Sequence, residues 1–126
     1  MTKIKTILSL IILTASFTIF ANEGKEIYDR YCTVCHSPSM ASMFGSPAAH
    51  NMQAWAERKE TAWTKVVEDN SSVKNLQTSE KEVIILNVLV QSAINGTDKG
   101  MPPMGTCMDC TEDQLQLAIK FMSSSE

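Results

Sequence analysis

The chain has 126 residues, 11 basic and 14 acidic side chains, a formal charge of −3, and 44% hydrophobic residues. This length leaves room for one small domain and excludes two, and the acidic balance argues against binding to nucleic acid. Its four cysteines form two Cys-x-x-Cys pairs, Cys32/Cys35 and Cys107/Cys110, whose interpretation depends on the compartment of the protein.

The N-terminus has the pattern of a secretory signal peptide. Two lysines precede Ile7–Phe20, a run in which only Ser and Thr are polar, and Ala21 is a small residue suited to cleavage. No second apolar run follows, which favours a cleaved leader over an uncleaved anchor. We expect residues 1–21 to be removed, leaving residues 22–126 as one periplasmic domain of formal charge −5 without stable membrane insertion.

The first half of this domain is expected to contain helices separated by one long loop. Residues 23–31 place apolar side chains on one face and charged side chains on the other, which predicts a helix. Residues 37–47 contain two prolines, a glycine and four serines, a composition typical of a loop. Two short helices, over 48–59 and 61–68, are predicted next, and the sequence "EDNSS" should end the second.

The second half is expected to contain two helices joined by an irregular loop. Ser79 with Glu82 has the capping-box pattern and predicts the start of an apolar helix, which Gly96 should end. The stretch that follows is expected to be an irregular loop, because two consecutive prolines cannot continue a helix. Thr111 with Gln114 repeats the capping-box pattern before a last helix whose apolar residues are spaced i, i+3, i+4 and i+7: Leu115, Ala118, Ile119 and Met122. No strand pattern occurs, so the predicted fold class is all-α.

The sequence Cys32-x-x-Cys35-His36 is the attachment motif of a c-type haem. Two cysteines three residues apart at a helix end can reach both vinyl groups of one porphyrin, and the adjacent imidazole can then face the iron. The alternatives are a disulfide beside an incidental histidine, half of a zinc site, and a thioredoxin-like redox pair. The interval before Cys107 is much longer than in paired zinc motifs, and a thioredoxin-like pair requires strands. One covalent haem c with His36 as the fifth iron ligand is therefore expected.

The sixth iron ligand is sought in "GMPPMGTCMDC", residues 100–110. A methionine thioether stabilises ferrous iron and suits an electron carrier. The two prolines after Met101 restrict the backbone and can hold its thioether in place, whereas Gly105 lets the chain turn away after Met104. Met101 is therefore favoured as the ligand, with Met104 as the alternative. His50, the other histidine, is interpreted as a surface or capping residue.

The second cysteine pair is followed by Thr111 rather than histidine, which argues against a second haem. Two cysteines this close in an exported protein are expected to form a short-loop disulfide. Closing so short a loop gains little chain entropy, so the expected role is local: fixing the turn before the last helix. A redox-active disulfide is the alternative.

Together these features resemble the class I c-type cytochromes, and among them the cytochrome c5 family. The resemblance also includes "GSP" at Gly45–Pro47, Trp55 with Arg58 three residues on, Ala93, Gly96 and "MPPMG". It implies a small cytochrome c fold, with N- and C-terminal helices packed around one haem. It further implies thioethers at Cys32 and Cys35, axial ligands His36 and Met101, and a Cys107–Cys110 disulfide.

The same resemblance implies surroundings for the haem. The Pro47 carbonyl would accept a hydrogen bond from His36 Nδ1, and Trp55 and Arg58 would approach the propionates. A core tryptophan and a solvated arginine are the alternatives for the last two. Two departures from the family stand out: Ser46 replaces alanine, and the link from Arg58 to Ala93 is longer than usual. The added segment would be a docking element or, as we favour, added helical packing.

The expected function is electron transfer by a soluble periplasmic monohaem cytochrome, a monomer or weak dimer that is not itself an enzyme. Its partners would be a quinol-oxidising complex, a terminal oxidase or a periplasmic reductase, met through weak, salt-sensitive contacts. The alternatives are a haem c subunit of a larger oxidoreductase, a ligand-binding haem enzyme or sensor with a labile sixth ligand, and a haem-free thiol or metal-binding protein.

Overall fold

A computed structural model describes residues 22–125, and every regular element in that range is helical. The expectation of an all-α fold is confirmed. The predicted leader, residues 1–21, lies outside the described residues. Within 22–125, none of the helices combines the length and apolar character that crossing a membrane requires.

The N-terminal helix extends beyond its predicted end and includes the attachment motif. Residues 22–27 are α-helical, η1 (Tyr28–Cys32) is a π-helical turn, and α2 (Thr33–His36) returns to α geometry. Ser37 then adopts an extended conformation, with ψ of 151°, which ends the helix. Single π-turns inside helices are frequent at functional sites, and this one ends on the first cysteine of the motif.

The predicted loop after the motif contains one short helix, α3 (Ala41–Phe44), which ends at Gly45. Gly45 has φ of 62°, a conformation that glycine adopts without steric cost. The rest of the predicted loop, up to Pro47, is irregular, as expected from its composition.

The helix α4 (Met52–Asp69) is continuous, so the prediction of two separate helices in this region is wrong. No glycine or proline interrupts this stretch, and the buried residues next to the predicted break, Ala62 and Trp63, belong to one core cluster with Ile85 and Leu89. The helix also starts four residues later than predicted. Asn51 caps it by accepting a hydrogen bond from the Ala54 N–H at 3.1 Å, and the left-handed backbone of His50 precludes an earlier start.

The helix α5 (Thr78–Asn95) follows a short 3₁₀ helix, η2 (Ser71–Asn75). Its capping box is formed by Gln77 and Glu80. The predicted pair, Ser79 and Glu82, lies two residues further along the chain than the observed cap, so that prediction is wrong. Gly96 ends the helix with φ of 74°, as predicted.

The last two elements follow the predicted order. The distorted 3₁₀ turn η3 (Pro103–Thr106) lies inside the irregular loop, and α6 (Glu112–Met122) follows it. Both hydrogen bonds of the predicted Thr111–Gln114 capping box are present, at 3.0 and 3.2 Å. The predicted apolar face of α6 is buried in full: Leu115, Ala118, Ile119 and Met122.

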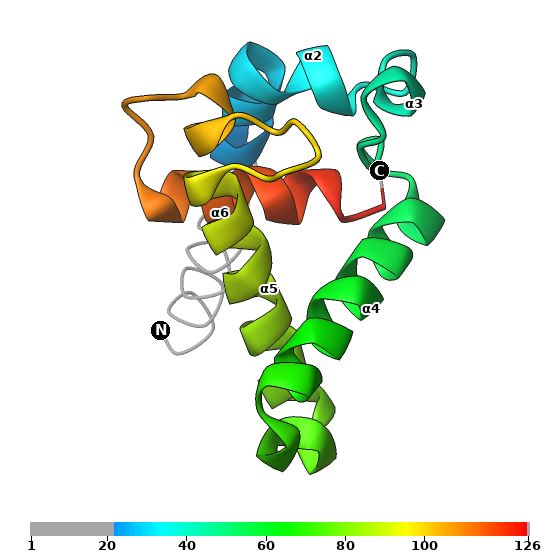
Figure 1. The fold of residues 1–126 in the computed structure, drawn as a ribbon. Coiled ribbons are helices and arrows are strands. Elements are labelled where there is room, and N and C mark those ends of the chain that lie inside the picture. Colours follow the sequence, from blue (N-terminus) through cyan, green and yellow to red (C-terminus); the bar gives the residue numbers. More distant parts are fainter. Residues whose placement is uncertain (1–21, 126) are drawn as a thin grey trace, which may run out of the picture.

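Figure 1 shows α4 and α5 as the two arms of a V that meet near η2, with α6 lying across α5 at the open end. The N-terminal helix packs on α6, and η3 packs on both α5 and η1. The crossing of the N-terminal helix with α6 depends on Gly24. A Cβ atom at this position would lie 2.5 Å from the Leu117 carbonyl oxygen, so no side chain fits.

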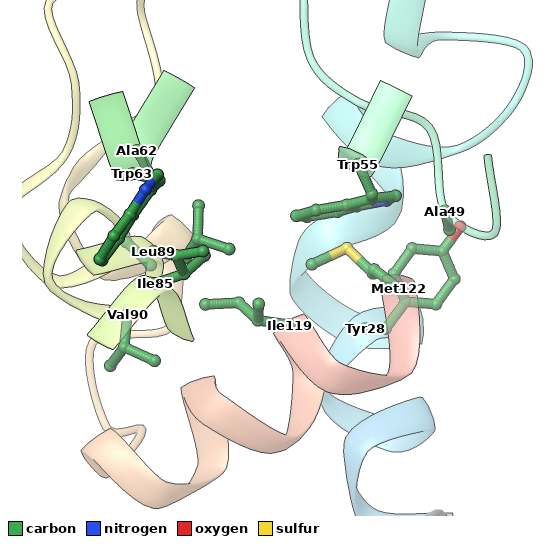
Figure 2. Packing of buried hydrophobic residues seen from close by; sticks show 11 residues of the cluster. Tyr28, Ala49, Trp55, Ala62, Trp63, Ile85, Leu89, Val90, Ile119 and Met122 are labelled. Atoms are coloured by element: carbon green, nitrogen blue, oxygen red, sulfur yellow. The ribbon is translucent and has the colours of Figure 1, made fainter. Parts of the chain in front are cut away.

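Two clusters of buried side chains hold these helices together. In the larger one, Figure 2 shows Trp63 with Leu89, Ile85 and Val90 near α5, and Trp55, Met122, Tyr28 and Ala49 near the end of α6. The smaller cluster joins the N-terminal helix to α6 through Ile27, Cys107, Cys110, Leu115 and Ala118. The attachment motif lies between the two clusters, because Cys32 packs against both.

Candidate haem site

The attachment motif presents two thiols and an imidazole at the end of the N-terminal helix. Cys32 and Cys35 are free thiols, both half-buried. Burial, followed by the neighbouring Cys35, raises the pKa of Cys32 to about 11. Within residues 22–125, no group of three or more histidine, cysteine or acidic side chains could hold a metal ion, so the zinc interpretation has no ligand set in this part of the chain.

The His36 imidazole is held in one orientation and one tautomer. Its Nδ1 lies 2.8 Å from the Pro47 carbonyl oxygen, and a carbonyl only accepts, so Nδ1 carries the proton. The lone pair is therefore on Nε2, the atom left for a metal. The ring is buried, at 8% exposure. Burial lowers the pKa of His36, the Pro47 contact opposes this change, and the Arg58 charge adds to it. A neutral imidazole with a fixed second nitrogen is the form that binds iron.

Trp55 and Arg58 lie beside this ligand rather than far from it. The indole of Trp55 stacks on the imidazole of His36, with centroids 6.1 Å apart and planes inclined by 19°. Its Nε1 donates to the Ala48 carbonyl at 2.9 Å, and its exposure is 4%. Arg58 donates to the Gly45 carbonyl at 3.4 Å. Both side chains thus support the loop around the ligand, while their approach to the propionates stays a prediction.

The methionine loop, residues 97–106, has a backbone conformation fixed at Met101. The Met101 carbonyl accepts from the Thr97 N–H at 2.9 Å, and the Met101 N–H donates to Thr97 Oγ1 at 3.3 Å. Pro102 is extended, with ψ of 152°. Gly96 allows the loop to pass close to α5, because a Cβ there would lie 2.8 Å from the Met101 carbonyl oxygen.

Met101 and Met104 belong to different parts of the interior. Met101 packs against the larger cluster, which also contains Trp55, the residue stacked on His36. Met104 has a left-handed backbone, with φ of 60°, and packs against the smaller cluster around the second cysteine pair. The two methionines therefore lie against different clusters, and the assignment of Met101 as an iron ligand stays a prediction.

Cys107 and Cys110 are joined by a disulfide, with Cα atoms 5.4 Å apart. The two residues are buried, at 3% and 8% exposure, and the Cys107 N–H donates to the Met104 carbonyl at 3.0 Å. The bridge therefore connects η3 to the start of α6. Its burial places it in a structural role and not in that of an accessible redox pair.

Comparison with known proteins identifies the family. Residues 20–122 match the family described as "Cytochrome C oxidase, cbb3-type, subunit III". The chain belongs to this family of c-type cytochromes. The chain is 29% identical over 103 residues to a cytochrome c5 of Ectopseudomonas mendocina, covering 82% of this chain and 90% of the relative. The cytochrome c5 of Azotobacter vinelandii is 26% identical over 103 residues, covering 82% and 94%. No solved structure matched the chain.

Membership of this family implies covalently bound haem c, and the chain carries its attachment motif at Cys32, Cys35 and His36. These side chains fit haem c, because Cys32 and Cys35 are not in a disulfide and His36 is a neutral imidazole with Nε2 available. Sequence reasoning did not predict the contact made by the Ser46 hydroxyl, and it interpreted His50 as a surface or capping residue without identifying its partner. Both bond to backbone carbonyls distant in sequence, which no residue pattern reveals.

Proposed function

We propose that this c-type cytochrome is a periplasmic monohaem electron carrier. The observation that carries the proposal is the Nδ1 hydrogen bond of His36 to Pro47, which leaves Nε2 as a lone-pair donor at the end of an attachment motif. A side chain held in this way needs no rearrangement when iron changes its charge, and small rearrangement favours rapid transfer of single electrons.

The proposed roles follow from the chemistry of each side chain. Cys32 and Cys35 would hold the haem through two thioethers, and His36 and Met101 would be the axial ligands. The haem supplies a reversible one-electron change at iron. Trp55 and Arg58 would line its edge, and Met104 is the alternative ligand. The Cys107–Cys110 disulfide would keep the methionine loop in place relative to α6.

The proposed location and partners rest on the sequence. Residues 1–21 have the pattern of a secretory leader, and the remaining chain has a formal charge of −5. An acidic carrier would meet basic patches on a quinol-oxidising complex, a terminal oxidase or a periplasmic reductase, through contacts that weaken as salt is added. In this account the mature protein is a soluble monomer or weak dimer, and chemistry occurs on its partners rather than on the carrier.

A second candidate function is that of a haem c subunit within a larger oxidoreductase. The description of the matched family, subunit III of a cbb3-type cytochrome c oxidase, favours it. The two functions differ in association. A carrier purifies alone from the periplasmic fraction, whereas a subunit co-purifies with membrane proteins in fixed stoichiometry.

Optical spectra and the intact mass of the purified periplasmic protein test the proposal. We expect the mass of one covalent haem, a low-spin spectrum in both oxidation states, and no rapid uptake of carbon monoxide by the ferrous form. Rapid, tight carbon monoxide binding would replace the carrier with a ligand-binding haem protein. A mass without haem would favour a thiol or metal-binding protein.

A further inference from the structure

The segment Gly45–His50, called the clamp segment below, is bonded to its surroundings at every residue. Its centre holds the proposed iron ligand: Pro47 accepts from His36 Nδ1 at 2.8 Å, and the Ala49 N–H donates to the His36 carbonyl at 2.7 Å. Gly45 and Ala48 accept from side chains of α4, as described above. The orientation of His36 therefore depends on where the two ends of this segment are fixed.

Ser46 fixes the first end. Its hydroxyl donates to the carbonyl of Cys35, the residue immediately before His36, and its backbone N–H donates to the Ala41 carbonyl at 3.0 Å. The hydroxyl thus ties the clamp segment directly to the attachment helix. An alanine in this position would keep the backbone bond and lose the contact with Cys35.

His50 fixes the second end, through contacts with residues at the end of α6, the furthest of which is 74 positions away in the sequence. Its backbone N–H donates to the Met122 carbonyl at 2.7 Å, and its Nδ1 donates to the Ser124 carbonyl at 2.8 Å. The ring also meets the face of Phe121 edge-on, with centroids 4.7 Å apart. His50 adopts φ of 62°, an uncommon conformation for a residue with a side chain, so this geometry is held by its bonds to the end of α6.

We propose that Ser46 and His50 are positioning residues for His36, acting through the clamp segment. This inference rests on the proposed role of His36 as an iron ligand. His50 caps the C-terminal end of α6, and a capping role alone would affect only stability. A positioning role has a further effect, because the bonds of Ser46 and His50 would then keep the Pro47 carbonyl next to Nδ1 of His36. That bond raises the electron-donating power of the imidazole, which stabilises ferric iron.

The test uses the holoprotein and the variants Ser46→Ala, His50→Gly and the double variant. Glycine suits the left-handed backbone, so His50→Gly removes the side-chain bond without adding backbone strain. We expect the His36 Nδ1 proton of the ferrous protein to exchange with solvent about tenfold faster, because a weakened hydrogen bond opens more often. The midpoint potential should rise, and the two substitutions should be non-additive.

Matched controls separate positioning from general loosening. Ser42→Ala removes an exposed hydroxyl of α3, and Ser124→Ala leaves the carbonyl that His50 uses while removing the Ser124 hydroxyl bond to Phe121. Neither should change Nδ1 exchange or potential. If His50→Gly does not fold, Ser46→Ala alone carries the test. Unchanged exchange and potential in Ser46→Ala, and in the double variant where it folds, would overturn the proposal.

A second readout keeps this test distinct from the proposed function. Exchange of the Ala49 amide, bonded to the His36 carbonyl, reports the clamp segment without reference to iron. Wild-type protein without haem would refute the proposed function, yet faster Ala49 exchange in the variants would still support the clamp. Wild-type protein with His-ligated haem and unchanged variants would refute only the clamp.

Discussion

The two ends of α4 are stabilised by different interactions. At its start, the clamp segment surrounds His36 with directional hydrogen bonds, and Trp55 stacks on the ring. At the far end, residues 60–83 form an arm around η2, which Trp63 joins to the rest of the protein by packing in the larger cluster. Within this arm, the Lys81 ammonium lies 4.9 Å from the centre of the Trp63 ring. Hydrogen bonds specify an orientation, whereas apolar packing specifies mainly burial.

This contrast indicates what the added segment between Arg58 and Ala93 does. Trp63 is 8% exposed and belongs to the same cluster as Trp55. The arm is therefore part of the hydrophobic core. The arrangement supports added helical packing over a dedicated docking element. Changes in the arm should then alter stability, and loss of side-chain hydrogen bonds of the clamp segment should alter the iron ligand.

The largest effect is expected from the cysteine pairs. Replacing Cys32 and Cys35 by alanine should remove covalent haem completely, because both attachment points are lost. Replacing Cys107 and Cys110 should leave haem attached and cost about 2 kcal/mol, the chain-entropy value for so short a loop. Intact mass and thermal unfolding measure the two outcomes. Haem retained covalently in the first variant would refute the attachment assignment.

Substitution of either tryptophan should give the next largest effect. Comparing Trp55→Ala with Trp63→Ala tests the difference between the two ends of α4 directly. Trp63→Ala should destabilise the protein by about 3–5 kcal/mol through a cavity in the arm, with an unchanged ligand spectrum. Trp55→Ala should cost a similar amount and also shift the spectrum, because the ring stacked on His36 is lost. Denaturant unfolding followed by both haem absorbance and circular dichroism distinguishes them. If Trp55→Ala and Trp63→Ala gave the same spectrum, the proposed difference between the two ends of α4 would be wrong.

Two glycines with left-handed backbones distinguish a steric clash with the methionine loop from the effect of backbone strain alone. Gly96→Ala should cost about 2 kcal/mol and weaken methionine ligation, since its Cβ would lie 2.8 Å from the Met101 carbonyl oxygen. Gly45→Ala, with φ of 62° and nothing within 4 Å of an added Cβ, should cost only about 1 kcal/mol from backbone strain. The test is carbon monoxide uptake by both ferrous variants, and only Gly96→Ala should bind it faster than wild type.

The smallest effect is expected at the surface of the arm. Lys81→Ala removes the contact with Trp63 and an ion pair to Glu60 at 3.8 Å, in which the Glu60 side chain is 70% exposed. Solvent screens the ion pair, so the loss should be about 0.5–1 kcal/mol, mostly from the ring contact. Thermal unfolding at low and high salt should give nearly the same loss, and a strongly salt-dependent loss would mean that the ion pair dominates.

The features that the sequence predicts well are local. The attachment motif, the Thr111–Gln114 capping box and the apolar face of α6 each depend on residues a few positions apart. The boundaries of α4 and α5 were predicted less well. Gln77 caps α5 although Ser79 is the commoner capping residue. The helix α4 continues through residue 60, next to the buried residues Ala62 and Trp63.

The contacts that position the candidate site could not be predicted in the same way. His50 bonds to Ser124 and Ser46 bonds to Cys35, and in both cases the acceptor is a backbone carbonyl. Every residue carries a carbonyl, so the partner leaves no pattern in the sequence. Only the fold brings these groups together. The Pro47 contact was anticipated from the family resemblance, not from its residue type.

The most direct test of the account is the identity of the second iron ligand, measured by NMR on oxidised protein with labelled methionine methyl groups. Paramagnetic iron strongly shifts the methyl resonance of a bound methionine. We expect one such resonance in the wild type, retained in Met104→Ala and lost in Met101→Ala. A shifted methyl resonance that persists in Met101→Ala and disappears in Met104→Ala would contradict the proposed pairing of His36 with Met101.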